Sequence, residues 1–213
     1  MTEGRLDLAR TLYDEAVFNG AADAPARGHR VLDSVEADLC LARGRLRHAE
    51  FLQRREEDPR ELADFQRAAE LYGALGDVRG EAEALFWLGT FHQVVREDTE
   101  TALPLLERSY ALADQVGDNL TMSYAVRHLG FADMAAGRLD DARKKLEESV
   151  ALRRAIGFVA GEAAGILALA QLDHESGRRD EGLARLDEAE RIAIASGANG
   201  ILGWIHEARA KLT

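Results

Sequence analysis

A repeat of about 40 residues constrains the fold of this 213-residue chain more than any other feature of its sequence. Gly76, Gly117, Gly157 and Gly197 recur at a nearly constant spacing, and each follows a segment with apolar residues at helical spacing. Two further series keep this period, at residues 88–89, 129–130 and 169–170, and at residues 102 and 106, 142 and 146, and 182 and 186. Three series in one register predict a chain built from repeated structural units.

Each unit is predicted to contain two helices and no strand. Ala142, Leu146, Val150, Leu152 and Ile156 approximate the spacing of one buried helix face. The opposite face is expected to lie in solvent, and its residues are Arg143, Lys144, Glu147, Glu148 and Arg153. No stretch shows the sustained alternation of apolar and polar residues that indicates a strand.

Glycine and aspartate mark the predicted helix ends. The four repeated glycines suit the left-handed residue that ends a helix, and Asp77 and Asp118 suit the N-cap of the next helix. The same signal is expected at the other turn of a unit, from Gly137 with Asp140 and from Gly177 with Asp180.

Proline completes the helix predictions, because the first turn of a helix does not need the N–H that proline lacks. Pro25, Pro59 and Pro104 are therefore expected near helix starts, and Gly44 is a candidate kink in one long helix. The predicted helices cover residues 3–18, 26–54, 60–75, 79–95, 101–116, 119–136, 140–156, 159–176, 180–196 and 199–212.

From about residue 37 to residue 196 the sequence resembles the tetratricopeptide repeat (TPR) family. The residues that carry this resemblance are Leu85, Leu88, Gly89, Ala102 and Leu106, and then Val126, Leu129, Gly130, Ala142 and Leu146. The chain departs from the family pattern in its longer period, in its Gly-Asp turns where proline is usual, and in His92, Asp133 and Asp173 where an aromatic residue is usual. Longer units of this kind are similar to repeats of bacterial LuxR-type and antibiotic-regulatory signalling proteins.

The resemblance implies an all-α fold, a right-handed superhelical array of antiparallel helix hairpins (an α-solenoid) with about ten helices. A single repeat domain would cover residues 1–213, with units at about 26–76, 77–117, 118–157 and 158–197 and with half-units 1–25 and 198–213 as caps.

The family binds its ligands on a concave surface, which the first helix of each unit lines. In this chain the matching residues are Phe86, Thr90, Gln93, Tyr124, Arg127, Phe131, Met134, Leu167, Gln171 and His174, extended towards the N-terminus by Arg43, Leu46, Glu50 and Gln53. Aromatic contacts would anchor a peptide there and Arg127 would orient it; the alternative is that Phe86 and Phe131 fill space between units. One cation and no asparagine at these positions disfavour a receptor for chaperone tails.

Catalytic and metal-binding patterns are weak. The six histidines form no His-Glu-x-x-His motif, and Asp173, His174 and Glu175 point in different directions on a helix. Gly157, Gly161 and Gly165 are expected to mark a close helix crossing and not a nucleotide site. Cys40 is interpreted as a small buried apolar residue. We therefore expect no cofactor, no metal site and no enzyme activity.

Charge and hydropathy restrict the partners. With 38 acidic and 27 basic side chains the formal net charge is -11, and the basic residues are interleaved with acids, which disfavours nucleic-acid binding. No apolar stretch approaches the ~20 residues that cross a bilayer. Together with the lone cysteine, this predicts a cytoplasmic protein. In the last predicted helix Leu202 and Trp204 lie beyond the apolar stripe, so they are expected to close over the groove or to form a homo-oligomer contact.

The sequence thus predicts a non-enzymatic scaffold that binds a peptide or protein segment in its concave groove. One alternative is a regulatory sensor for a small peptide or metabolite, which a compact pocket closed by Trp204 would favour. The other is an enzyme or enzyme accessory, which would need a histidine or carboxylate pair in a deep cleft.

Overall fold

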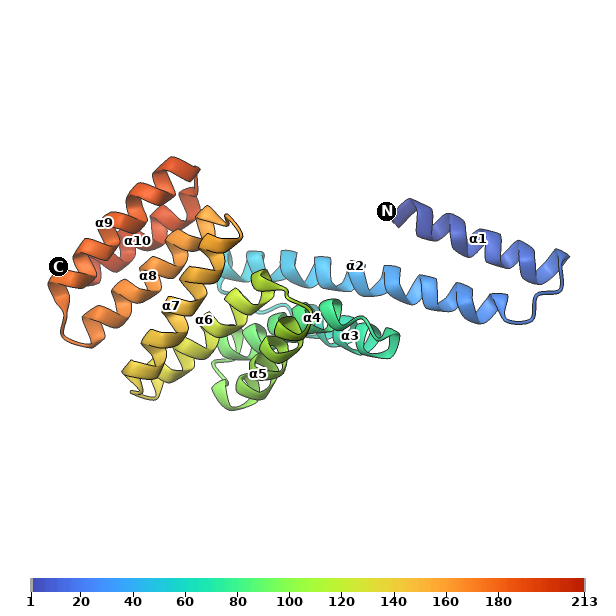
Figure 1. Cartoon of the computed structure of the whole chain (residues 1–213), viewed down its shortest axis with the longest axis horizontal. Helices are drawn as coiled ribbons and strands as arrows, with labels where there is room; N and C mark the ends of the chain where they lie inside the picture. The colour runs from blue at the N-terminus through green and yellow to red at the C-terminus, as the bar shows by residue number, and fades with distance from the viewer. Residues whose placement is uncertain (1, 213) are drawn as a thin grey trace. The chain divides into compact units, whose positions relative to one another are not determined.

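Helices form nearly all of the structure (Figure 1). The computed structural model describes the backbone of residues 2–212 and the side chains of residues 4–211. Within that part of the chain there are ten α-helices, one π-helical segment and no strand, so the fold is all-α. The elements are α1 (Thr2–Phe18), α2 (Ala24–Arg54), α3 (Pro59–Leu75), α4 (Val78–Thr90), η1 (Phe91–Val95), α5 (Thr99–Gln115), α6 (Asn119–Ala135), α7 (Leu139–Ala155), α8 (Val159–Glu175), α9 (Arg179–Ser196) and α10 (Asn199–Leu212).

The helix ends follow the local signals closely. Every predicted α-helix begins and ends within two residues of its observed bounds, except that the end of α4 passes into the π-helical segment η1. The repeated glycines have left-handed φ angles from 64° to 73°, as predicted. Asp77 accepts a hydrogen bond from Gly80 N at 3.0 Å, and Asp118 accepts one from Thr121 N at 3.4 Å, so both N-caps are confirmed.

Two expectations about helix ends are wrong. Asp140 and Asp180 are not N-caps, because they lie inside the first turn of α7 and α9, where a carboxylate interacts favourably with the helix dipole. Pro104 lies inside α5, five residues after its start. Gly44 does not interrupt α2; it is buried, and a Cβ there would clash with the Phe65 ring, so the missing side chain makes room for that ring.

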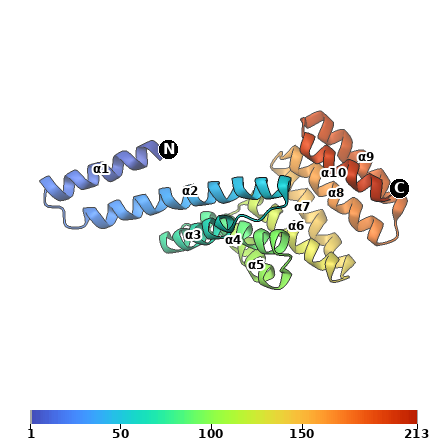
Figure 2. The ribbon, with the colours of Figure 1, turned by 180° about the vertical axis from the view of Figure 1, so that it is seen from behind.

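The chain divides into two compact units, Met1–Leu105 and Leu106–Thr213, called the N-terminal and C-terminal units. In the N-terminal unit α1 packs on α2, α2 on α3, and α3 on α4. Figures 1 and 2 show α1 and α2 as an antiparallel hairpin. The core of this unit contains Ala37, Leu41, Phe65, Ala68, Leu71, Tyr72, Ala84 and Phe91. Cys40 is only partly buried against this core, and burial raises the pKa of its thiol.

In the C-terminal unit each helix from α6 to α10 packs on the next, and α10 also contacts α8. Helix α8 is surrounded, because every residue from 163 to 170 is buried. Its many alanine and glycine residues allow this close approach: a Cβ on Gly165 would lie 2.7 Å from Val150 Cγ2 of α7. Gly165 thus marks a close helix crossing, as expected, whereas Gly157 ends α7 with a φ of 69° and has no atom within 4 Å of its Cβ position.

The predicted buried face of α7 is partly wrong. Arg153 was expected in solvent, but its side chain is only 1% exposed, while Ile156 is 40% exposed. The buried positions are 142, 146, 149, 150 and 153, which form a regular helical stripe. Serine and arginine occupy two of these positions. Because the prediction used apolar residues alone, it assigned Leu152 and Ile156 to the buried face instead.

Gly130 lies at the crossing of α6 and α7. A Cβ there would lie 3.0 Å from Leu146 Cδ2 and 3.4 Å from the backbone oxygen of Ala142. We expect Gly130→Leu to lower the free energy of unfolding by about 2 kcal/mol, since overpacking outweighs the ~1 kcal/mol gained by removing a helical glycine. Chemical denaturation followed by circular dichroism measures this change. Gly203→Leu in α10 is the control, because no atom lies within 4 Å of that Cβ. Equal stability of the two variants would contradict the close crossing.

Candidate functional site

Two arginine side chains that have no acidic partner among the described residues lie close together in the C-terminal unit. Arg127 comes from α6 and Arg153 from the last turn of α7, and both reach the backbone of α8. Arg127 Nη2 lies 3.5 Å from the oxygen of Ala164, and Arg153 Nη1 donates to the oxygen of Gly161 at 2.8 Å. These two carbonyls are about one helical turn apart. We call Arg127 and Arg153 the arginine pair.

Arg153 is held from several sides. Its Nε lies 3.3 Å from Ser123 Oγ, and its guanidinium carbon lies 5.0 Å from the centroid of the Tyr124 ring. Gly165 leaves room beside it, because a Cβ at that position would lie 3.7 Å from Arg153 Nη1. All of these partners are neutral, so they fix the position of the cation without neutralising its charge.

Arg127 has fewer partners. Its guanidinium carbon lies 4.5 Å from the centroid of the Phe131 ring, a cation–π contact within one helix. Its Nε is buried and has no hydrogen-bond partner among the described residues, although the side chain as a whole is partly exposed. The residue is thus partly exposed as a whole, and its one donor without a partner among the described residues is buried.

Burial acts on the ionisation of both side chains, and the charge of Arg153 acts in addition on Arg127. Burial, with the nearby charge of Arg153, lowers the pKa of Arg127 to about 9. Burial lowers the pKa of Arg153 to about 10. Both groups still carry a positive charge at neutral pH, because each pKa lies well above 7. In the described part of the chain neither guanidinium forms an ion pair with a carboxylate.

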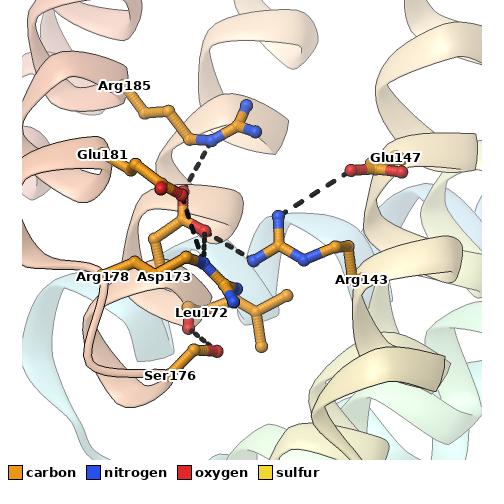
Figure 3. Close-up of polar contacts among 8 residues, drawn as sticks. All are labelled: Arg143, Glu147, Leu172, Asp173, Ser176, Arg178, Glu181 and Arg185. Atoms are coloured by element: carbon orange, nitrogen blue, oxygen red, sulfur yellow. Dashed lines mark hydrogen bonds and ion pairs between the residues drawn. The ribbon is translucent and has the colours of Figure 1, made fainter.

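Nearby cations in the same unit are, by contrast, paired with buried aspartates. Asp173 is fully buried and accepts from Arg143 Nη2 at 2.5 Å, Arg178 Nε at 3.2 Å and Arg185 Nε at 2.7 Å (Figure 3). These contacts connect α8 to α7, to α9 and to the turn between α8 and α9. Figure 3 also shows Arg143 between Asp173 and Glu147. Glu181 pairs with Arg178 at 3.2 Å, so three carboxylates balance the three arginines, and the cluster ties three helices together.

Asp133 forms the corresponding cluster one repeat earlier in the chain. It accepts from Arg138 Nη2 at 2.6 Å and from Lys145 Nζ. Burial alone would raise the pKa of Asp133, but the hydrogen bonds from Lys145 and Arg138 outweigh it and hold the pKa below its ordinary value. Arg138 and Arg178, and Lys145 and Arg185, are also separated by one repeat, so these clusters are part of the repeat. The repeat spacing of these cations is visible in the sequence, whereas the resemblance to the repeat family points only to the aspartates.

The predicted groove residues differ in their exposure. Phe86, Thr90 and Leu167 are only 2%, 3% and 3% exposed, so they offer no surface to a ligand in this conformation. Those that are partly exposed are Gln93, Tyr124, Arg127, Phe131, Met134 and Gln171, and those that are exposed are His174, Arg43, Leu46, Glu50 and Gln53. Leu202 packs partly buried against the core, whereas Trp204 is 43% exposed. The proposed roles of Leu202 and Trp204 stay predictions.

The structure brings Tyr124, Arg127 and Phe131 together on one stripe of α6, at the arginine pair. Phe86, Thr90 and Gln93 belong to the N-terminal unit and the other predicted residues to the C-terminal unit. A single groove through both units stays a prediction. Sequence reasoning missed Arg153, although its position, eleven residues after Ala142, continues the buried stripe of α7.

A buried acid–base pair lies in the core of the N-terminal unit. His48 Nδ1 lies 2.8 Å from Glu61 Oε1, and the two residues are 6% and 0% exposed. The His48 ring contacts Trp87 edge-on at 5.5 Å, and Trp87 stacks on Phe65 at 5.8 Å. Glu61 Oε2 is buried and has no hydrogen-bond partner among the described residues. Enclosed among aromatic rings, the pair contributes to the packing of this unit.

Comparison with known proteins identifies the fold alone. No protein-family model matches the chain, and no curated protein matches it. Among solved structures, the crystal structure of BtubC (BKLC) from P. vanneervenii matches with a TM-score of 0.50 and 18% sequence identity, over 92% of this chain and 91% of that one. This likeness supports the overall helical fold and says nothing about the ligand.

Membrane-spanning helices and metal-binding groups are both absent from the part of the chain that the structure describes. From residue 2 to residue 212, no helix combines the length and the apolar character that crossing a membrane requires. Over the same residues, no group of three or more histidine, cysteine, aspartate or glutamate side chains is arranged to hold a metal ion.

Proposed function

We propose that this chain is a TPR-like α-solenoid that binds a peptide or protein segment in its concave groove, as a non-enzymatic cytoplasmic interaction scaffold. One observation carries the proposal: Arg127 is partly exposed, stacks on Phe131 and has a donor that finds no partner among the described residues. An arginine beside an aromatic ring is the type of residue that dominates binding energy at protein interfaces. Tyr124, on the same stripe of α6, adds a second aromatic side chain.

A selection from a random displayed peptide library tests this proposal. Peptides that bind the whole chain are synthesised, and their affinities are measured by fluorescence anisotropy. We expect Arg127→Ala and Phe131→Ala each to weaken binding by ~1 to 2 kcal/mol, or about 5- to 30-fold, with unchanged helicity by circular dichroism. Arg191→Ala is the control, because Arg191 is an exposed residue of α9 away from this stripe. Affinities that stay the same in both variants would contradict the assignment of this surface.

A further inference from the structure

We propose that the arginine pair binds a carboxylate of the partner peptide, with Arg127 making the contact and Arg153 acting as a positioning residue behind it. The proposal deepens the function proposed above and rests on it for the source of the carboxylate, which is either an acidic side chain or the end of the peptide chain. Arg127 is a binding residue in this account, whereas Arg153 acts through its charge.

The first step is the charge balance. A charge removed from water is normally paired with an opposite charge or neutralised. In this unit Asp133 and Asp173 pair with five cations, namely Arg138, Lys145, Arg143, Arg178 and Arg185. Cations that hold helices together in this unit are therefore paired with acidic residues of the chain. The arginine pair has no such acidic partner among the described residues. An anion from outside would complete the balance there.

The second step is the way in which the pair is held. Aromatic faces and backbone carbonyls position both guanidinium groups: Phe131 and Ala164 for Arg127, and Tyr124 and Gly161 for Arg153. Neutral partners of this kind orient a cation and leave its charge available. A carboxylate partner within the chain would instead occupy the donors, as Asp173 does for Arg185.

The third step is access and ligand class. Arg127 is partly exposed and Arg153 is 1% exposed, so only Arg127 can touch a ligand. The guanidinium of Arg127 offers one planar fork, in which Nε has no partner among the described residues and Nη2 makes only a long contact of 3.5 Å, and such a fork fits the two oxygens of a carboxylate. A dianionic phosphate would need more donors, and it would meet stronger repulsion from a chain of net charge -11. The geometry thus favours a carboxylate over a phosphate.

The test measures coupling between Arg127 and the carboxylate of a selected peptide. The selected peptide is compared with two derivatives, one with its acidic side chain changed to the amide and one with an amidated C-terminus. With the unmodified protein we expect one of these changes to weaken binding at least tenfold, and this identifies the source of the carboxylate. With Arg127→Met the same change should weaken binding less than twofold. An equal loss in both proteins would overturn the site and leave the proposed function standing.

A second measurement separates binding from a structural role. Because its folded-state pKa lies below the ordinary value, Arg127 opposes folding at neutral pH, and this cost decreases only as the pH rises from about 9 towards the ordinary pKa of arginine. Arg127→Met should therefore unfold thermally at the same temperature as the unmodified protein or higher, as should the control Arg191→Met. A clear decrease confined to Arg127→Met would indicate a structural residue and overturn the proposal.

If no peptide is selected, the proposed function fails, and sodium acetate then tests the site by itself. At constant ionic strength with sodium chloride, acetate should shift the Nε–H resonance of Arg127 in a saturable manner, and inorganic phosphate should do so more weakly. Arg153→Gln should reduce the acetate affinity severalfold, because it removes the second positive charge. No shift with acetate, or a stronger response to phosphate, would overturn the carboxylate site.

Discussion

Asp173→Asn is expected to lower the free energy of unfolding by about 3 kcal/mol. The carboxylate is fully buried and accepts hydrogen bonds from three arginines of different elements. Removing its charge leaves three cations facing one another, and breaking a buried ion pair typically costs ~3 to 5 kcal/mol. The arginines are 23% to 38% exposed, so they can turn towards water, which places the expected loss at the lower end of that range.

Asp141→Asn is the matched control for this variant. Asp141 also forms an ion pair, with Lys144, but the two side chains are 53% and 76% exposed. Exposed pairs contribute only ~0 to 1 kcal/mol, so this variant should change stability little. Urea denaturation of the two variants measures the difference. If both variants lost the same small free energy of unfolding, the Asp173 cluster would stabilise the protein no more than a surface ion pair does.

The helix ends could be predicted from the sequence because the signals for them are local. A glycine in the left-handed conformation and an aspartate that caps the next helix act within a few residues. Gly76 and Asp77 show both signals, and the structure has both features there. Such signals do not depend on what packs against the helix. Periodicity and turn residues were therefore sufficient to predict the position of every helix in the sequence.

The π-helical segment η1 could not be predicted in this way. It occurs where the repeat has His92 in place of Asp133 or Asp173. The positions that correspond to the cations Arg138 and Lys145 hold Glu97 and Pro104 in this unit. Without the buried ion cluster this turn is built differently, and Glu97 takes a left-handed φ of 55°. The departure was visible in the sequence, but its structural outcome depends on packing that the sequence pattern does not describe.

The candidate site was predicted only in part, for a related reason. Arg127 and Phe131 were found because they lie on the expected face of α6. Arg153 was missed because a polar residue is normally placed in solvent, whereas this side chain finds its partners on α6 and α8. Leu167 was expected in the groove but is buried, because α8 is covered on nearly all sides. Helical periodicity indicates one face, and it cannot tell which neighbours surround a helix.

The largest coupling between two substitutions is expected for His48 and Glu61. His48→Leu leaves a carboxylate buried beside aromatic rings and should cost about 3 kcal/mol, whereas Glu61→Met leaves a histidine that can stay neutral and should cost about 2 kcal/mol. The double variant removes both polar groups and replaces them with apolar side chains of similar size. It should therefore lose only about 1 kcal/mol in total.

Denaturant unfolding of the unmodified protein, the two single variants and the double variant forms a complete cycle, with an expected coupling of about 4 kcal/mol. The coupling follows from contact, since the two side chains lie 2.8 Å apart and are enclosed by the same core. His206 provides a control, because it also lies 3.1 Å from a carboxylate, that of Glu190, but is 62% exposed. A cycle of His206→Leu with Glu190→Met should give less than about 1 kcal/mol. If the two cycles gave equal coupling, burial would not be what makes the His48–Glu61 pair matter for stability.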